Sequence, residues 1–240
     1  MHDLSFNKQK VGKIKIYSKQ MLEDEELLSL YKLLKTKIHG ARSATNQGGS
    51  VVKGDIGSMK VVVKHYRRGG VLHFINKHYY LSTFTASRAK REFEFLELVK
   101  RKGVNAPTPI AYAIKGGFVY RNWLATKEIE NTFDLCFLKE NDFIKIEKYT
   151  KELARQIKIL IKNKIFHVDL HPRNVIVDEN ENLYILDFDK ARFFKGSYNE
   201  LRDKYILRWR RAVIKHNLCD LLSECLCANL RDNFNNMENF

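Results

Sequence analysis

The sequence has few residues that cross-link a chain or interrupt its helices and strands. It contains four cysteines and three prolines in 240 residues. Three of the cysteines, Cys219, Cys225 and Cys227, lie close together, and Cys136 lies far from them. This spacing matches neither a disulfide framework nor a pair of C-x2-C zinc motifs. A disulfide-stapled miniature domain is therefore excluded, and we expect reduced thiols, because L-C-D-L-L-S-E-C-L-C has apolar residues at helical spacing.

Long apolar runs are also missing. No run approaches the roughly 20 apolar residues that cross a bilayer, and the first twenty residues lack the apolar centre of a secretory signal. With 44% hydrophobic and 30% charged residues, the composition is globular. We therefore expect a cytosolic protein, and one that is able to lie on a membrane surface.

Acidic residues are scarce relative to basic ones, 28 against 43, so the net charge is +15. Two segments carry this excess. Lys60–Lys102 holds 11 basic and 3 acidic residues, and Lys190–Lys215 holds 9 and 2. Such a surplus favours anionic partners such as phosphates, nucleic acid or an acidic membrane face. Any function has to account for two basic segments on an otherwise neutral chain.

The hydrophobic pattern predicts strands first and helices later. An amphipathic helix or extended lead-in over Glu23–Leu34 precedes a glycine-rich loop over Gly40–Ser50. The later elements expected are hairpins over Val51–Lys53 with Met59–His65, Ile110–Ile114 with Phe118–Ile129 and Asn174–Val177 with Leu183–Phe188, and helices over Arg88–Lys102 and Ile146–Ile161. This order predicts an α+β fold with a β-rich N-terminal lobe, residues 1–128, and a mostly helical C-terminal lobe, residues 129–240.

The densest functional signal is H-V-D-L-H-P-R-N at residues 167–174, followed by D-F-D at residues 187–189. In protein kinases, an H-x-D-L-x-x-x-N loop supplies a base and a metal-binding asparagine, and a later aspartate holds Mg²⁺. Here five positions separate Asp169 from Asn174, and 13 separate Asn174 from Asp187. Ordinary capping residues would explain one such position but not three. We therefore predict a protein-kinase-like fold with Asp169 as catalytic base and with Asn174 and Asp187 as metal ligands.

A lysine at the end of a β-branched strand is the next candidate. Lys64 closes V-V-V-K, which is similar to the kinase strand whose lysine contacts the phosphates of ATP. Such a lysine needs a carboxylate from the following helix to hold it in place. We select Glu92 over Glu94, because it lies next to Arg91 and opposite the apolar residues of that helix.

Two further segments are expected to touch the nucleotide. Gly48, Gly49 and Ser50 would let backbone amides approach the phosphates, although a plain connecting loop is the alternative. Glu128 and Ile129 follow the second hairpin and occupy the place of a hinge. Their backbone groups are expected to meet an adenine edge.

Together with H-Y-R-R-G-G at residues 65–70, these motifs resemble the lipopolysaccharide kinase family, and within it the kinases of 3-deoxy-D-manno-octulosonic acid (Kdo). The resemblance runs from about Gly48 to Ala191 and includes S-R-A-x-R-E-F at 87–93 and P-x-P-I-A at 107–111. It implies phosphorylation of the 4-hydroxyl of Kdo on a Kdo-lipid A precursor, with ATP and Mg²⁺. It also implies a peripheral protein on the cytoplasmic side of the inner membrane of a Gram-negative bacterium.

The chain departs from the family pattern in two places. It has D-L-H-P-R-N where the family usually has D-L-N-A-H-N, and this form looks more like the aminoglycoside phosphotransferases. No A-P-E motif follows Asp187, which argues against an ordinary protein kinase. The enzymatic alternatives are therefore another small-molecule phosphotransferase, of the aminoglycoside-like kind, and an atypical RIO-type kinase.

The implied acceptor suits the two basic segments, because Kdo carries a carboxylate and lipid A carries phosphates. The expected acceptor contacts are Arg67 and Arg68 in the first segment and Lys190 and Arg192 in the second, followed by Arg208, Arg210 and Arg211. A nucleic-acid-binding module without catalysis would also use a positive surface. That class leaves the three polar positions unexplained, so we expect an anionic glycolipid and an anionic membrane surface as partners, and no nucleic acid.

Overall fold

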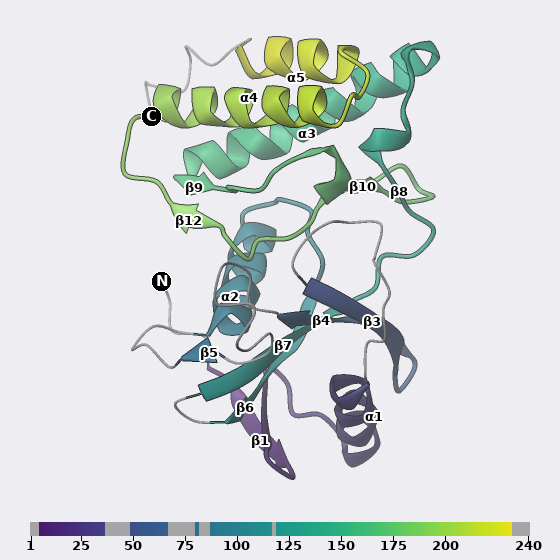
Figure 1. The fold of residues 1–240 in the computed structure, drawn as a ribbon, viewed down its shortest axis with the longest axis vertical. Helices are drawn as coiled ribbons and strands as arrows, with labels where there is room; N and C mark the ends of the chain where they lie inside the picture. Colours follow the sequence, from purple (N-terminus) through teal and green to yellow (C-terminus); the bar gives the residue numbers. More distant parts are fainter. Residues whose placement is uncertain (1–4, 37–48, 67–79, 82–86, 117–118, 232–240) are drawn as a thin grey trace. The chain divides into compact units, whose positions relative to one another are not determined.

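The computed structural model describes residues 5–36, 49–66, 80–81, 87–116 and 119–231 (Figure 1). By internal contacts, the chain divides into two units. The first comprises residues 1–97 and 107–128, and the second comprises residues 98–106 and 129–240. The sequence pattern had assigned residues 98–106 to the N-terminal lobe, whereas the structure groups them with the C-terminal one. The first unit is rich in strands and the second in helices, as predicted for an α+β fold.

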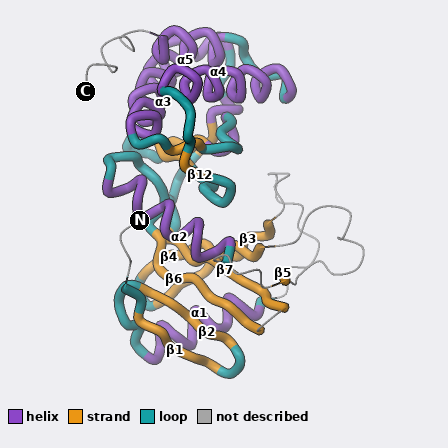
Figure 2. Tube along the Cα trace, turned by 90° about the vertical axis from the view of Figure 1, so that its left-hand side faces the viewer, coloured by secondary structure: helices purple, strands orange, loops and turns teal. Residues whose placement is uncertain are grey.

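The first unit is built on one antiparallel sheet. Its described strands are β1 (Asn7–Val11), β2 (Ile14–Ser18), β3 (Gly49–Ile56), β4 (Met59–Tyr66), β5 (Tyr80–Leu81), β6 (Pro109–Gly116) and β7 (Val119–Lys127). They pair in the order β1-β2-β6-β7-β4-β3, and β5 pairs with β7 beside this path. Figure 2 shows these strands together in orange.

The helices α1 (Asp24–Lys35) and α2 (Arg88–Arg101) cover opposite faces of the sheet. Successive strand residues point to opposite faces. On β6, Ala111 and Ala113 join a core that includes Leu30 of α1. Tyr112 lies between these two alanines and packs edge-on against Phe93 of α2, with ring centroids 5.9 Å apart. The sheet therefore has apolar side chains on both faces and holds α2 firmly.

The N-terminal hairpin of β1 and β2 was missed in the sequence pattern. Its signal is the alternation in K-I-K-I-Y, which places Ile14 and Ile16 in the core, and the turn at Gly12, whose φ is +58°. The β3–β4 hairpin is longer than predicted. Strand β3 runs on to Ile56, and Gly57, with φ +57°, lies in the turn.

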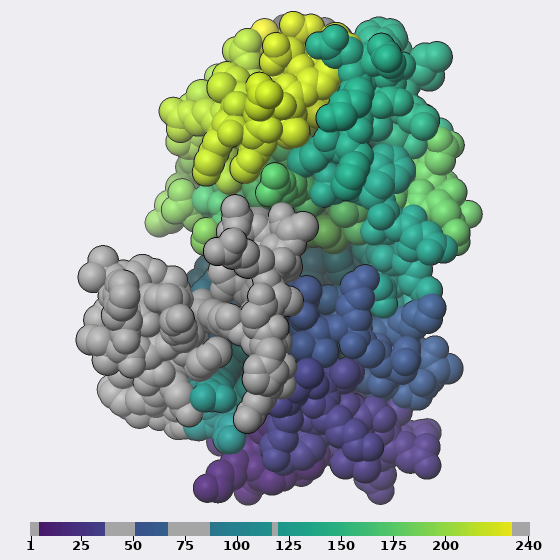
Figure 3. All heavy atoms as spheres, turned by 45° about the vertical axis from the view of Figure 1, so that its right-hand side comes forward, coloured from purple at the N-terminus to yellow at the C-terminus, as the bar shows by residue number. Residues whose placement is uncertain are grey.

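The second unit is mostly helical. Its helices are α3 (Phe143–Lys162), α4 (Tyr198–Lys215) and α5 (Leu221–Arg231), and its short strands are β8 (Phe133–Asp134), β9 (Ile165–Phe166), β10 (Val175–Val177), β11 (Leu183–Ile185) and β12 (Arg192–Phe193). Helix α3 packs against both α4 and α5, and Figure 3 shows α5 in yellow beside the teal of α3 at the surface. Among the described residues, no helix has the length and apolar character needed to cross a membrane.

Helix α4 is held at its start and along its buried face. Ser197 and Glu200 form a reciprocal capping box at its start. Trp209 is fully buried, and its indole Nε1 donates a hydrogen bond to the carbonyl oxygen of Leu222 at 2.9 Å. Side chains that α4 directs into the unit are therefore held in defined positions.

Residues 98–106 join the second unit through hydrogen bonds. Helix α2 ends at Arg101, one residue before the predicted end, and Gly103 follows with a φ of +89°. The backbone N–H of Asn105 then donates to Oε1 of the buried Gln156 at 2.9 Å, and its Nδ2 donates to the carbonyl of Leu183 at 3.1 Å. The carbonyl of Asn105 accepts from the N–H of Ile185 at 2.9 Å. These bonds satisfy buried polar groups of α3 and β11, which explains why the segment belongs there.

Candidate active site

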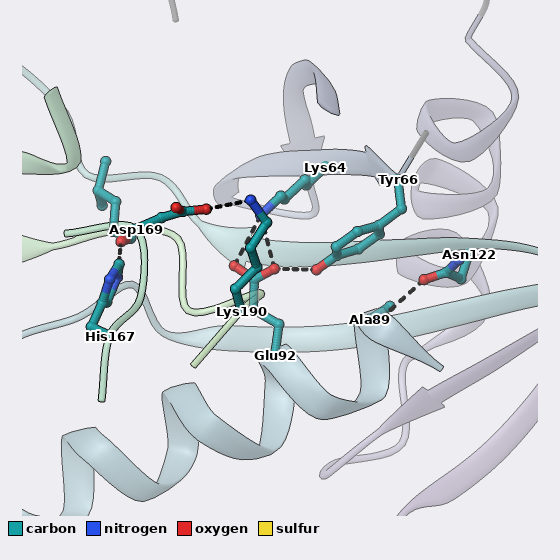
Figure 4. Close-up of polar contacts among 9 residues, drawn as sticks. Lys64, Tyr66, Ala89, Glu92, Asn122, His167, Asp169 and Lys190 are labelled. Carbon is teal, nitrogen blue, oxygen red and sulfur yellow. Dashed lines mark hydrogen bonds and ion pairs between the residues drawn. The ribbon is translucent and has the colours of Figure 1, made fainter. Parts of the chain in front are cut away.

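The first unit holds a buried ion pair between two of the predicted site residues (Figure 4). Nζ of Lys64, on β4, lies 2.8 Å from Oε2 and 3.1 Å from Oε1 of Glu92, on α2. The side chain of Glu92 is 4% exposed. The predicted pairing of Lys64 with Glu92 is thus present, whereas Glu94 pairs with Lys90 on its own helix. The pair presents an ammonium group in a fixed position, which suits the binding of a phosphate.

Tyr66 is a third member of this cluster, and the sequence analysis missed it. Its hydroxyl donates a short hydrogen bond to Oε2 of Glu92. Tyr66 lies two residues after Lys64 on β4, so both side chains share one face of the sheet. The alternation of side chains along a strand would have identified Tyr66 as a neighbour of Lys64. The first turn of α2 is also hydrogen-bonded to the sheet, because Oδ1 of Asn122 accepts from the N–H of Ala89 at 3.0 Å (Figure 4).

Part of the segment predicted as a phosphate-binding loop is a strand in the structure. Gly49 and Ser50 lie in β3, opposite Tyr66 and His65, rather than in a loop, and Gly48 lies outside the described residues. Their backbone groups take part in strand pairing, because β3 begins before its β-branched residues, Val51 and Val52. At the predicted hinge, the N–H of Glu128 donates to the carbonyl of Lys60 at 2.9 Å.

This donor of Glu128 is therefore committed to the sheet, and its carboxylate pairs with Lys53 at 2.6 Å. The contact with an adenine edge that is expected of the backbone groups of Glu128 and Ile129 stays a prediction.

In the second unit, Asp169 and Asn174 lie on one loop that backbone and side-chain bonds close. Asn174 Nδ2 donates to the carbonyl oxygen of Asp169 at 3.0 Å, and the N–H of Asn174 donates to the carbonyl of His171 at 2.8 Å. The N–H of Leu186 donates to the carbonyl of Asn174 at 2.8 Å, which links this loop to the segment carrying Asp187. Hydrogen bonds therefore connect the segments that carry Asp169, Asn174 and Asp187, and we call this arrangement the connected frame.

Buried groups behind the loop hold Asp169 in place. Nε2 of His167 lies 2.8 Å from the carbonyl oxygen of Leu186, which can only accept, so Nε2 carries the proton (Figure 4). Burial lowers the pKa of His167, which keeps the ring neutral. The hydroxyl of Tyr205, on α4, accepts from the N–H of His167 at 2.8 Å and donates to the carbonyl of Ile165 at 2.9 Å.

Asp187 has a backbone conformation that is uncommon for its residue type. Its φ is +63°, in the left-handed region. A non-glycine residue there costs on the order of 1 kcal/mol and is retained where its surroundings fix it, often at functional sites. The conformation turns the chain sharply after β11, between Leu186, whose N–H donates to the Asn174 carbonyl, and the buried Phe188. It gives Asp187 a fixed direction.

Two cations contact the carboxylate of Asp169. Nζ of Lys190 lies 2.6 Å from Oδ2 (Figure 4), and Nη2 of Arg208, on α4, lies 3.4 Å from Oδ1. Lys190, which was predicted as an acceptor contact, thus lies beside Asp169, the predicted catalytic base. Arg192 lies on β12 and is exposed over the ring of Phe166. Arg67 and Arg68 lie outside the described residues.

The residues present fit a Mg²⁺ ion that takes part of its ligands from phosphates. Asn174 uses its amide nitrogen on the Asp169 carbonyl, so its Oδ1 is the atom of this amide that suits a cation. Among the described residues, no three His, Cys, Asp or Glu side chains gather as a metal cage. Mg²⁺ in kinases is held by one or two protein oxygens together with phosphates and water. Asn174 and Asp187 fit that coordination.

Acid is expected to destabilise the protein through His171. Burial, and then the charge of Arg208, lower the pKa of this ring to about 4. The unfolded chain, with a histidine pKa of about 6.5, binds a proton first as pH falls, so stability present above pH 6.5 is lost between about 6.5 and 4. Allowing for solvent screening, the loss of stability is about 2 kcal/mol.

Urea unfolding at pH 7.5 and pH 4.5 measures this loss of stability. His171→Gln should have a shallower dependence, and equal slopes for both proteins would contradict the assignment.

Comparison with known proteins supports the resemblance seen in the motifs. The family model described as "Lipopolysaccharide kinase (Kdo/WaaP) family" matches residues 33–218. A 3-deoxy-D-manno-octulosonic acid kinase of Vibrio vulnificus is 31% identical over 165 residues, which are 61% of this chain and 68% of that protein. Proteins of the same name are 29% identical over 190 residues in Actinobacillus succinogenes, covering 73% and 76%, and 30% identical over 175 residues in Haemophilus influenzae, covering 66% and 72%. The chain therefore belongs to the lipopolysaccharide kinase (Kdo/WaaP) family.

Proposed function

We propose that the protein is an ATP-dependent kinase that phosphorylates the 4-hydroxyl of Kdo on a Kdo-lipid A precursor. The observation that carries the proposal is the connected frame of Asp169, Asn174 and Asp187 in a chain of this kinase family. Lipopolysaccharide core biosynthesis is the process in which this product belongs. The acceptor, an anionic glycolipid, also suits a chain with a net charge of +15.

Each residue has a defined task in this reaction. Asp169 takes the proton of the acceptor hydroxyl as its oxygen attacks the γ-phosphorus, while the bond to the bridging oxygen breaks and ADP leaves. Lys64, oriented by Glu92, contacts the phosphates of ATP. Asn174 and Asp187 would hold Mg²⁺, which would offset the charge of the triphosphate.

Phosphoryl transfer tests this assignment directly. Full-length protein with Mg²⁺ and γ-labelled ATP should label a Kdo-lipid A precursor, and the label should reside on the 4-hydroxyl of Kdo by mass spectrometry or NMR. The same assay with an aminoglycoside and with protein alone tests the two alternative classes. Labelling of an aminoglycoside, or of the protein itself, with none of the Kdo acceptor would overturn the proposal.

The outer face of α4 supports a peripheral position on an anionic membrane, on the cytoplasmic side of the inner membrane. Leu207 and Ile214 are 49% and 75% exposed, and their spacing of seven places them on one helix face. The exposed basic residues around them are Lys204, Arg210, Arg211 and Lys215. Apolar residues rimmed by cations on a helix are typical of interfacial binding, and each basic residue contributes about 1 kcal/mol near anionic lipid.

Removing these two apolar side chains should weaken membrane binding. In co-sedimentation with phosphatidylglycerol vesicles, Leu207→Ser/Ile214→Ser is expected to lower the partition coefficient by at least about tenfold, because each side chain loses its transfer into the interface. Leu28→Ser is the matched control, since Leu28 on α1 is 50% exposed beside acidic residues. Equal partitioning of all three proteins would refute this surface. Binding should also fall with salt and in phosphatidylcholine vesicles.

A further inference from the structure

The ion pairs of Asp169 involve both of its carboxylate oxygens. Oδ2 lies 2.6 Å from Lys190 Nζ, and Oδ1 lies 3.4 Å from Arg208 Nη2. A general base needs an oxygen within hydrogen-bond reach of the hydroxyl whose proton it takes. Here two cations compete with that hydroxyl for the same lone pairs. The arrangement seen in the protein alone is therefore not the one in which Asp169 works best as a base.

These pairs contribute little to the stability of the fold. The side chains of Lys190, Arg208 and Asp169 are 61%, 37% and 24% exposed. Ion pairs with such exposure contribute about 0–1 kcal/mol, because water solvates both partners. An exchange of one anion for another between these cations therefore has a low energetic cost. The pairs are placed where they can change partners.

Arg208 has hydrogen-bonding capacity that Asp169 does not use. Its Nε is shielded from solvent and has no hydrogen-bond partner among the described residues. The guanidinium edge formed by Nε and Nη2 is the edge that binds carboxylates and phosphates through two parallel hydrogen bonds. On this edge, one donor is unfilled and the other makes a long contact of 3.4 Å. A planar oxyanion would fill both.

The charges around Asp169 also favour an incoming anion. The charge of Arg208 lowers the pKa of both His171 and His216, and that of Arg173 lowers the pKa of His216. These shifts are secondary to burial, and the charge of Asp169 opposes that of Arg208 at His171. The carboxylate of Asp169 faces two cations, so at this point cations outnumber the anion that they contact.

We propose that Arg208 and Lys190 form a binding site for an oxyanion of the acceptor, and that this anion replaces Asp169 between them. The proposal rests on the proposed function, in which the acceptor is an anionic sugar. A carboxylate of the sugar and a phosphate of the lipid share the required chemistry. Asp169 then turns to the acceptor hydroxyl only when the anion is bound, so that recognition of the acceptor makes the base available. Neutral sugars and water, which bring no anion, are poor acceptors for that reason.

Steady-state kinetics of full-length protein with Mg²⁺ and ATP test the exchange. With free Kdo as acceptor, Arg208→Gln should raise KM about 10- to 100-fold, the loss of a bidentate charge-assisted contact. With the methyl ester of Kdo, KM should be high in the unchanged protein and should not rise further in the variant. Acceptor-independent ATP hydrolysis should increase in Arg208→Gln, because Asp169 loses a competing cation. Arg202→Gln is the matched control, since Arg202 is an arginine of α4 paired with an aspartate, Asp203, at 3.0 Å.

Two results would overturn the proposal. One is equal KM for Kdo and its ester in the unchanged protein. The other is an Arg208→Gln variant that loses kcat equally on both acceptors with unchanged KM, which would make Arg208 only a positioning residue for Asp169. Lys190→Gln provides a second variant on an exposed side chain if Arg208→Gln does not fold.

Binding without turnover separates this inference from the proposed function. Calorimetric titration with free Kdo, with its methyl ester and with inorganic phosphate shows which oxyanion the site takes. If no Kdo acceptor is phosphorylated but an oxyanion binds and Arg208→Gln weakens its Kd about tenfold or more, the function is wrong and the site stands. If Kdo is phosphorylated but Arg208→Gln binds every oxyanion with unchanged Kd, the site is wrong and the function stands.

Discussion

Asp169→Asn is expected to lower kcat for phosphoryl transfer by about three orders of magnitude, the range of a lost general base. Asparagine keeps the size of the side chain and accepts a hydrogen bond, but it cannot take the proton of the acceptor hydroxyl. The loop itself should survive, because Asn174 binds the backbone carbonyl of Asp169 and not its side chain. Thermal unfolding is therefore expected within about 1 kcal/mol of the unchanged protein, as for partly exposed ion pairs.

The acceptor affinity of this variant carries extra information. If Lys190 and Arg208 exchange Asp169 for the acceptor's anion, Asp169→Asn removes the competitor and should bind free Kdo at least as tightly as the unchanged protein. Asp203→Asn is the control, since Asp203 is an exposed aspartate paired with an arginine on α4. A kcat for Asp169→Asn within threefold of the control would exclude Asp169 as the base.

Lys64→Met is expected to reduce both stability and activity. The variant leaves Glu92, buried to 3% residue exposure, without the cation on its two oxygens. Removing one partner of a buried pair costs about 3 kcal/mol, because the remaining charge stays desolvated. The hydrogen bond from Tyr66 lessens this cost but brings no charge. Because Lys64 is proposed to contact the phosphates of ATP, kcat/KM for ATP should fall roughly 100-fold.

A double variant separates the two effects. In Lys64→Met/Glu92→Gln, the carboxylate that has lost Lys64 is replaced by a neutral amide, so urea unfolding should recover most of the lost free energy, whereas ATP turnover should stay low. Lys53→Met is the control, because Lys53 pairs with Glu128 on the same sheet but is 67% exposed. Recovery of activity together with stability would mean that Lys64 serves the fold and not the nucleotide.

The parts of the site that the sequence predicted are those close together along the chain or ordered by a repeating element. Asp169 and Asn174 share one loop, and Lys64 with Glu92 follow from a strand and the helix after it. Arg208 was expected only as an acceptor contact. Its approach to Asp169 depends on how α4 packs, 39 residues further along, and no local pattern carries that information.

The errors in the prediction have a common physical origin. Glycine-rich composition predicted a loop at Gly49 and Ser50, but pairing with the long strand β4 overrides local preference. The strand predicted over Val51–Lys53 was likewise too short, because the same pairing carries β3 on to Ile56. Strand edges are set by hydrogen-bond partners that lie far away in sequence, so their last residues are the hardest to predict.

The position of Asn105 limits how this enzyme can be recombined with its relatives. A chimaera joined at residue 128 would take α3 and β11 from one parent and Asn105 from the other. The buried Gln156 and the backbone of Leu183 and Ile185 would then meet a foreign partner. A chimaera that keeps the C-terminal unit intact has to include residues 98–106 from the same parent. In the sequence, the β6–β7 hairpin separates these residues from the rest of that unit. Sequence drift in this nine-residue stretch is thus expected to follow the C-terminal half rather than its own neighbours.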